Sequence, residues 1–285
     1  MKRFVRGAKS FFLTFPGAAF GAVIVLIFLV LAFIAPLLHS QAYAVSAVDK
    51  LMPPQWFSGP HILGTDSLGR DLLARMIVGV RISLMVAAAA VVVAGAIGVV
   101  VGVVSGYFGR WADTALMRLT DTLMAIPLVL FAIFVMMVVG SGIRTLIFVI
   151  ALTQWMTYAR TARAESLQLR EQEHVSASSS LGASHLRIMV SNIFPNVLPS
   201  AIALATINVS FVILLEAGLS YLGLGVPLPD PSLGSLLAEG RQFITRAPWL
   251  AIYPGATLML LVLGVNLLGD GLRSYLDPRS RERST

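Results

Sequence analysis

Two polar side chains inside long apolar segments could take part in chemistry, Glu216 and Asn208. Glu216 is the only acidic residue within such a segment, and a carboxylate in hydrocarbon is costly unless it faces protein or a water-filled cavity. Two roles follow for Glu216: a neutral acid that hydrogen-bonds neighbouring helices, or a polar group that lines a transport pathway. Asn208, two helical turns earlier on a similar face, favours the pathway. The scarcity of other charge in these segments argues against proton-coupled transport.

The motifs that carry catalysis or energy conversion in other proteins are absent from the sequence. Lysine occurs only at positions 2, 9 and 50, outside any glycine-rich turn, so there is no phosphate-binding loop. The four histidines lack the spacing of a metal site, no GxSxG nucleophile motif occurs, and cysteine is absent. We therefore expect no metal and no cofactor on this chain, and active transport would take its energy from a partner.

The composition indicates a polytopic membrane protein. Of 285 residues, 57% are hydrophobic and 12% are charged, which is about half the charged fraction of ordinary soluble domains. A run of about 20 apolar residues can cross a bilayer. Six such segments are predicted, at 17–38, 83–106, 122–140, 145–159, 198–222 and 250–269. Pro127 predicts a kink in the third, and Gln154 and Thr157 dilute the fourth.

The distribution of positive charge predicts the orientation. If the N-terminus is cytoplasmic, 14 of the 21 Lys and Arg residues lie on the cytoplasmic side and 7 on the other. Both termini and the loop 160–197 are then cytoplasmic, and the net charge of +7 reflects the loops, with no nucleic-acid partner. A signal peptide is the alternative for the first segment, because Ala42-Tyr43-Ala44 resembles a cleavage site. Its apolar run exceeds the usual length, so an uncleaved span is expected.

A polar stretch at 171–199 separates two of the apolar segments, so it must protrude from the membrane. Apolar residues recur at near-helical spacing among its Ser, His and Arg residues, and Gly182 interrupts them. A short helix of small residues outside the bilayer is suited to docking against another protein. The alternative is a solvated connector.

Two other segments predict how helices are arranged. Residues 61–82 predict an amphipathic helix at the outer surface, N-capped by Asp66, with Asp66–Arg70 and Asp71–Arg75 paired along it. The outer loop 223–249 predicts a short helix between Leu233 and Ile244. In the second span, small residues recur every four positions on one face, which allows close packing within the subunit or against a partner. These residues are Gly98, Gly102 and Gly106.

Four ordered motifs resemble one family of transporters. LGASHLRIMVSNIFPNVLP at 181–199 resembles the EAA loop of ABC-importer permeases, in the version of the dipeptide, oligopeptide and nickel family. The stretches at 63–84, 216–237 and 268–279 agree with the same family. The resemblance extends over the chain from about residue 10 and points to the C-type permease subunit.

The resemblance implies an all-α, six-span membrane protein in which one N-terminal span precedes the five-span core of a type I ABC-importer permease. Within the core, the cytoplasmic loop 160–197 would couple the permease to an ATPase. The expected divisions are 1–60 for the cytoplasmic segment, first span and start of the outer loop, 61–82 for the outer helix, 83–270 for the core, and 271–285 for a cytoplasmic tail.

The coupling loop departs from the family pattern at one place. The family commonly has Glu-Ala-Ala where this chain has Ser176-Ala177-Ser178, so Glu173 or hydrogen bonds from Ser176 would replace the missing carboxylate contact. The residues expected to dock on the ATPase are Glu173, His174, Val175, Ser176, Ala177, Ser178, Leu181, Gly182, Ala183 and Arg187.

By the same resemblance, the chain forms half of an import pathway in the bacterial cytoplasmic (inner) membrane and is not an enzyme. Its expected partners are a homologous permease subunit, two ATPase subunits that bind ATP and Mg²⁺, an extracytoplasmic substrate-binding protein, and membrane lipid. The expected cargo is di- or oligopeptides, with nickel or glutathione as alternatives. A self-sufficient secondary transporter or channel is the rival class. A purely structural anchor would leave Glu216 and the outer loop without a role.

Overall fold

The computed structural model describes residues 15–56 and 59–276, and these residues form helices joined by loops, with one isolated bridge in place of any strand. The all-α class is confirmed. The elements are α2 (Pro16–Ile34), η1 (Ala35–Leu38), α3 (His39–Tyr43), α4 (Leu72–Phe108), α5 (Arg110–Met124), α6 (Leu128–Val139), α7 (Ile143–Arg170), α8 (Glu173–Ser180), α9 (His185–Ile188), the π-helical turn η2 (Met189–Ile193), α10 (Phe194–Tyr221), α11 (Leu233–Gln242) and α12 (Trp249–Leu276).

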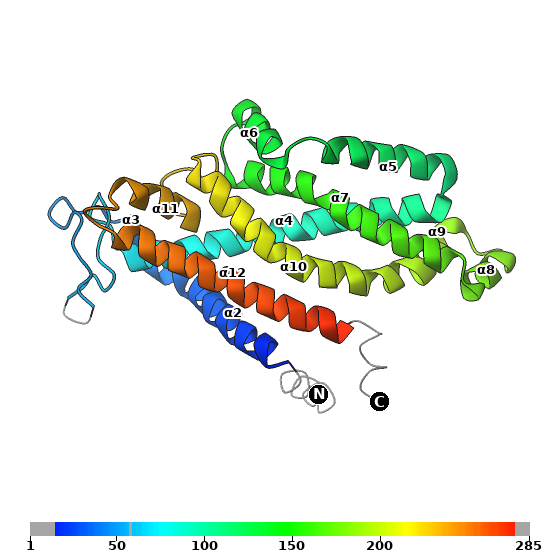
Figure 1. Ribbon diagram of the computed structural model, residues 1–285, viewed down its shortest axis with the longest axis horizontal. Coiled ribbons are helices and arrows are strands. Elements are labelled where there is room, and N and C mark those ends of the chain that lie inside the picture. Colours follow the sequence, from blue (N-terminus) through cyan, green and yellow to red (C-terminus); the bar gives the residue numbers. More distant parts are fainter. Residues whose placement is uncertain (1–14, 57–58, 277–285) are drawn as a thin grey trace.

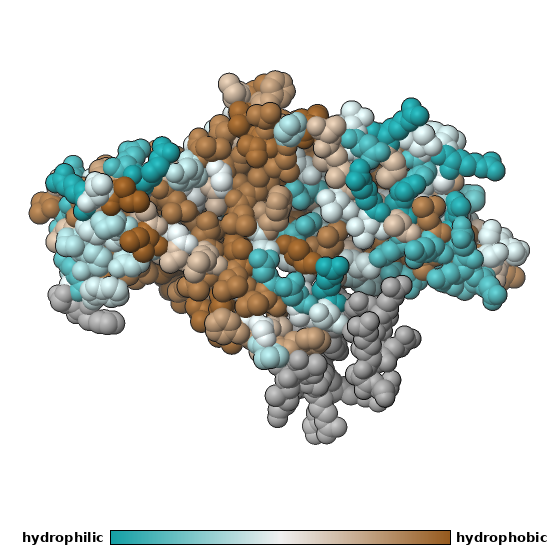
Figure 2. Space-filling view, viewed as in Figure 1, coloured by the Kyte–Doolittle hydropathy of each residue, from teal (hydrophilic) through white to brown (hydrophobic). Residues whose placement is uncertain are grey.

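The long helices run along the length of the molecule, with α3 and α11 at one end and α8 and α9 at the other (Figure 1). Figure 2 shows apolar residues gathered across the middle of the visible face and hydrophilic residues gathered toward both ends. This distribution matches a bundle whose middle lies in lipid. The tail at 277–285, which carries part of the predicted cytoplasmic charge, lies outside the described residues.

The predicted count of six spans is not reached. Among the described residues, four helical stretches are long and apolar enough to cross a membrane, and a bent pair makes a fifth. The pair is α5 and α6, whose axes differ by 86° across the break at Pro127, so the predicted kink is a full interruption. The fourth predicted segment, 145–159, lies in α7. Polar residues dilute its apolar run, and much of α7 is buried inside the bundle rather than exposed to lipid.

The glycines of the second span bring α4 and α7 to backbone distance. A Cβ atom at Gly106 would lie 2.7 Å from the carbonyl oxygen of Arg163. At Gly98 and Gly102 a Cβ atom would lie closer still to carbonyl oxygens of α7. The close packing predicted from these glycines therefore occurs within the subunit, against α7.

The peripheral helix α2 packs on α12 in the same manner. A Cβ atom at Gly21 would lie 2.7 Å from the carbonyl oxygen of Gly264, and Ile24 in turn covers Gly264. Tyr43, at the end of α3, donates a hydrogen bond of 2.6 Å to Asp230 in the loop before α11. The first span is thus fixed along its length and at its C-terminal end.

The prediction of an outer interfacial helix over residues 61–82 is wrong for the first half of that segment. Residues 61–71 form turns closed by a bridge between Thr65 and Asp71, and α4 begins at Leu72. The N-cap is Asp71, which accepts a hydrogen bond from the Ala74 amide, and not Asp66. The turns form because Asp66 instead accepts hydrogen bonds from the amides of Leu68 and Arg70, which closes a tight loop.

The charged residues of this segment form a buried cluster instead of pairs along a helix. Arg75 is 1% exposed and Asp66 is 2% exposed, and their side chains are in contact. Arg75 also donates to Glu239 of α11 at 2.6 Å, and Arg70 bridges the same two carboxylates. The predicted Asp66–Arg70 pair is present, but Arg75 pairs with Asp66 and Glu239 instead of Asp71. The cluster joins the outer loop, α4 and α11, and α11 itself starts at the predicted place with a capping box from Ser232 and Ser235.

The α4–α7 contact predicts contrasting effects for two glycines of the same helix. We expect Gly102→Ala to lower the free energy of unfolding by about 1–3 kcal/mol, because the added methyl group meets the backbone of α7. Gly95→Ala is the control, since its methyl group would only touch the Tyr158 ring at 3.6 Å, an ordinary contact. Thermal unfolding of the purified, detergent-solubilised protein measures both. Equal melting temperatures for the two variants would contradict close packing at Gly102.

Candidate functional site

The polar loop predicted from the sequence forms two short helices that project from one end of the bundle (Figure 1). Of the eight described residues of α8, only Val175 is buried. Ser176, Ala177 and Ser179 are exposed, and Leu181 at the tip is 88% exposed. The remaining predicted loop residues Glu173, His174, Gly182 and Arg187 are exposed, and Ser178 and Ala183 are half-buried.

The turn between α8 and α9 depends on Gly182. Its φ is +80°, a left-handed conformation, and its amide donates to the Ser179 carbonyl oxygen at 3.0 Å. No atom lies within 4 Å of the position that a Cβ would take. Gly182 is therefore required for its backbone conformation and not for close approach, the two possibilities that its residue type leaves open.

The base of the loop is anchored on α4. Val175, Ile188 and Ile193 form an apolar cluster with Val99 and Val103 of α4. At the end of α4, the Tyr107 hydroxyl lies 2.7 Å from His185 Nδ1, and Arg170 donates to the Tyr107 carbonyl oxygen at 3.2 Å. The exposed face of α8 is thus held on a fixed support.

The helix α5 is attached to the bundle mainly through charged side chains. Of its residues, all described, only Thr120 is buried. Asp113 pairs with Arg163 and accepts a hydrogen bond from Ser105, and Asp121 pairs with Arg160 at 2.6 Å. These pairs connect α5 to α7 and α4 near the end of the bundle that carries α8.

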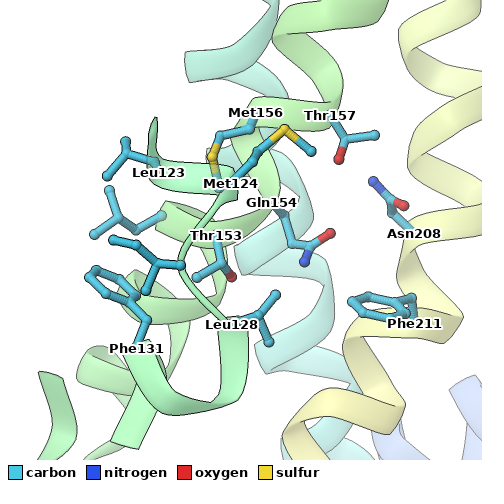
Figure 3. Close-up of a pocket in the computed structure, with 12 residues that line it drawn as sticks. Leu123, Met124, Leu128, Phe131, Thr153, Gln154, Met156, Thr157, Asn208 and Phe211 are labelled. Atoms are coloured by element: carbon cyan, nitrogen blue, oxygen red, sulfur yellow. The ribbon is translucent and has the colours of Figure 1, made fainter. Parts of the chain in front are cut away.

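A second feature is a cavity of about 320 Å³ between the α5–α6 break, α7 and α10. Figure 3 shows Gln154 of α7 and Asn208 of α10 pointing toward one another across the gap. Asn208, predicted as a pathway residue, lies in this cavity and is 9% exposed. The lining residues are Leu123, Met124, Ile126, Leu128, Phe131, Leu152, Thr153, Gln154, Met156, Thr157, Asn208 and Phe211.

Glu216, the other candidate pathway residue, does not line this cavity. It is 0% exposed, and its two carboxylate oxygens accept hydrogen bonds from Ser83 of α4 at 2.6 Å and from Ser220 at 2.7 Å. Glu216 has two possible roles, to hydrogen-bond neighbouring helices or to line a transport pathway. Its buried, hydrogen-bonded environment matches the first role. The other role is disfavoured because packed protein surrounds the carboxyl group on every side.

This environment predicts how substitutions of Glu216 behave. Glu216→Gln keeps polar atoms facing both serines, so we expect a nearly unchanged melting temperature. Glu216→Leu strands the buried hydroxyls of Ser83 and Ser220, and each unpaired group costs roughly 1–3 kcal/mol of unfolding free energy. Thermal unfolding in detergent distinguishes the variants, with the exposed Glu171→Leu as control. If Glu216→Leu proved as stable as Glu216→Gln, the carboxyl group would not be what joins the helices.

The chain is similar to known proteins in sequence and in fold. Residues 98–282 match the family model described as "Binding-protein-dependent transport system inner membrane component". The chain belongs to this family. It is therefore the transmembrane component of an ABC importer, a class that works with ATPase and substrate-binding partners.

Curated relatives cover nearly the whole chain. The dipeptide transport system permease protein DppC of Alkalihalophilus pseudofirmus is 38% identical over 93% of this chain and 86% of its own length. The oligopeptide transport system permease protein OppC of Bacillus subtilis has the same identity and coverage. A putative peptide permease of Brucella suis is 44% identical over 80% of this chain and 75% of its own length.

A solved structure agrees in fold. A chain of the MetNI methionine ABC transporter, in an inward-facing conformation, superposes with a TM-score of 0.56 at 21% identity. The match covers 71% of this chain and 96% of that chain. The helical core is thus that of an ABC-importer permease.

Of the residues that line the cavity, sequence reasoning proposed only Asn208 as a pathway residue, and the most informative one that it missed is Gln154. Its amide stood out only as a polar interruption of the fourth apolar segment. That interruption was itself the signal, because a polar side chain in a membrane helix is expected to face protein or a cavity. Its pairing with Asn208 depends on how α7 and α10 pack, which the spacing along the chain does not reveal.

Proposed function

We propose that this chain is one of two permease subunits of an ATP-driven importer of di- or oligopeptides in the bacterial cytoplasmic membrane. The observation that supports it most directly is the exposed loop α8–α9 on an importer-type bundle, in a chain whose curated relatives are named as peptide permeases over most of their length. The chain itself catalyses no covalent chemistry. Two ATPase subunits bind ATP and Mg²⁺, and an extracytoplasmic protein delivers the cargo.

In this proposal, α8 inserts into a groove of an ATPase subunit. Its exposed residues Ser176, Ala177 and Ser179 are small, so two backbones can approach closely there, and the protruding Leu181 adds apolar contact area. Movement of the ATPases is transmitted through Val175 and the apolar cluster beneath it to α4 and α10. The pathway then changes between inward- and outward-facing states. Ser176 and Glu173 supply polar contacts in place of the carboxylate that the family loop commonly carries.

Two substitutions test the coupling role. Gly182→Val forces a β-branched residue into a left-handed conformation, and Ala177→Arg places a charge where docking would desolvate it. We expect each to reduce cargo-stimulated ATP hydrolysis on the order of tenfold, which corresponds to about 1.4 kcal/mol. Co-purification of the ATPases and hydrolysis in the reconstituted complex are the measurements.

The matched controls are Gly182→Asn, which tolerates positive φ, and Ala177→Ser, which keeps a small side chain. Both should retain association and hydrolysis close to the unsubstituted complex. Normal assembly and transport in the Gly182→Val and Ala177→Arg complexes would mean that the loop is only a solvated connector.

The orientation is part of the proposal. Both termini and α8 face the cytoplasm, as the excess of Lys and Arg on that side suggests. In this cysteine-free chain, Ser179→Cys and Val48→Cys place single thiols at exposed positions at opposite ends of the molecule. A membrane-impermeant maleimide added to intact cells should label position 48 alone, and permeabilised cells should label both. Labelling of position 179 from outside would reverse the topology.

A self-sufficient channel or secondary transporter, the rival class, is disfavoured by membership of the importer family, and nickel and glutathione are the alternative cargoes. The rival class predicts transport by this chain without ATPase subunits. Assay of the purified chain alone against the complete complex separates the two mechanisms, and uptake competition among a dipeptide, Ni²⁺ and glutathione separates the cargoes.

A further inference from the structure

The cavity between α7 and α10 has a lining of a particular chemistry. Its polar members are two amides, Gln154 and Asn208, and two hydroxyls, Thr153 and Thr157. The other eight lining residues are apolar, and none of the twelve carries a charge. Such a surface favours a ligand that has neutral hydrogen-bonding groups and apolar side chains.

The side-chain amide of Asn208 is buried with an unused hydrogen-bond donor. The side chain is 9% exposed, and its buried Nδ2 atom has the Tyr158 hydroxyl as a polar neighbour but no partner in full hydrogen-bond geometry among the described residues. Leaving a buried donor unpaired is unfavourable, and buried polar groups in folded proteins nearly always have a partner. Asn208 lines the cavity, so rotation of its side-chain amide is needed for a bound molecule to provide one.

Gln154 makes the site two-sided. It points from α7 toward Asn208 of α10 across the gap (Figure 3). A side-chain amide has both a carbonyl acceptor and NH₂ donors, which matches the acceptor and donor of a peptide group. Met124, Leu128 and Phe211 are among the apolar residues around the amides, and methionine in particular adapts to side chains of different shape.

We propose that this cavity is a station for the peptide backbone, in which Gln154 and Asn208 hydrogen-bond one peptide group of the passing cargo while the apolar walls accept its side chains. The inference rests on the proposed function, because it takes a peptide as the cargo. The volume of about 320 Å³ is at the small end of ligand sites, so the station holds a short stretch of chain. The lining has no carboxylate, imidazole or thiolate, the groups that bind metal ions, so a metal cargo does not fit it.

The station makes the permease selective for the amide bond itself, independent of the side chains. The test compares trialanine with an isosteric analogue in which esters replace both of its peptide bonds and so remove their N–H donors. Uptake of both is measured at saturating concentration in liposomes that contain the complete complex with its binding protein. The unsubstituted complex, Asn208→Leu and Gln154→Met are compared, because both substitutions keep the side-chain size and remove the amide.

We expect each variant to lose about tenfold in trialanine uptake, the effect of one hydrogen bond, and to lose much less with the ester. The preference for trialanine over the ester therefore falls in the variants. Any preference of the binding protein cancels in this comparison, because the same binding protein delivers both peptides to every complex. Retained ATP hydrolysis stimulated by the loaded binding protein confirms that the variant complexes assemble.

Tyr158→Phe is the matched control. The Tyr158 hydroxyl is the polar neighbour of Asn208 and likewise has no partner in full hydrogen-bond geometry among the described residues, but its side chain does not line the cavity. The complex that carries Tyr158→Phe should prefer trialanine over the ester as strongly as the unsubstituted complex does. The proposal that Gln154 and Asn208 bind a peptide group would be overturned by either of two results. One is an unchanged preference for trialanine in Asn208→Leu and Gln154→Met, and the other is an equal fall of that preference in Tyr158→Phe. Failure of the proposed function looks different, since the unsubstituted complex would then import neither peptide.

Discussion

The backbone-to-backbone contact between α4 and α7 is the constraint on which the other features depend. Glycines on α4 remove the side chains that would separate the helices, so the carbonyl groups of α7 lie where Cβ atoms would otherwise be. This contact fixes the rotation of α7 and so turns Gln154 toward α10. It also places the end of α7 beside the end of α4, where Arg170 and Tyr107 support the loop formed by α8 and α9. The cavity and the loop are therefore positioned by one helix pair.

Polar interactions complete the bundle where apolar packing cannot specify it. In lipid, helix association gains little from hydrophobicity, because the tails are as apolar as the side chains. Glu216 links α4 and α10 through two serine hydroxyls, and the buried cluster around Arg75 links α4 to the outer loop and α11. By contrast, α5 depends on Asp113 and Asp121 at its surface. The elements thus differ in how firmly they are held, and α5 is the least buried of the long helices beside the cavity.

Much of this arrangement could be predicted from the sequence. Periodic glycines, a lone acidic residue in an apolar segment and a polar loop interrupted by Gly182 each correspond to a feature found at the predicted place, because each has a local physical cause. The turns at 61–71 were missed because i,i+4 charge pairs suggest a helix, whereas Asp66 satisfies backbone amides and distant arginines. The proline at 127 predicts a kink but not its angle of 86°, and the approach of Gln154 to Asn208 depends on contacts between segments far apart in sequence, which periodicity does not report.

The uncharged lining of the cavity has an electrical consequence. A charge that crosses the full membrane potential changes in energy by about 2.3 kcal/mol for each 100 mV. Because none of the residues around the cavity is charged, their rearrangement between two conformations transfers no net charge of this chain across the field. Any voltage dependence of the cycle then comes from the cargo, the partner subunits and charged groups of this chain outside the cavity, such as the Asp113–Arg163 pair. For a cargo without net charge, passage through the cavity itself therefore adds no dependence on the membrane potential.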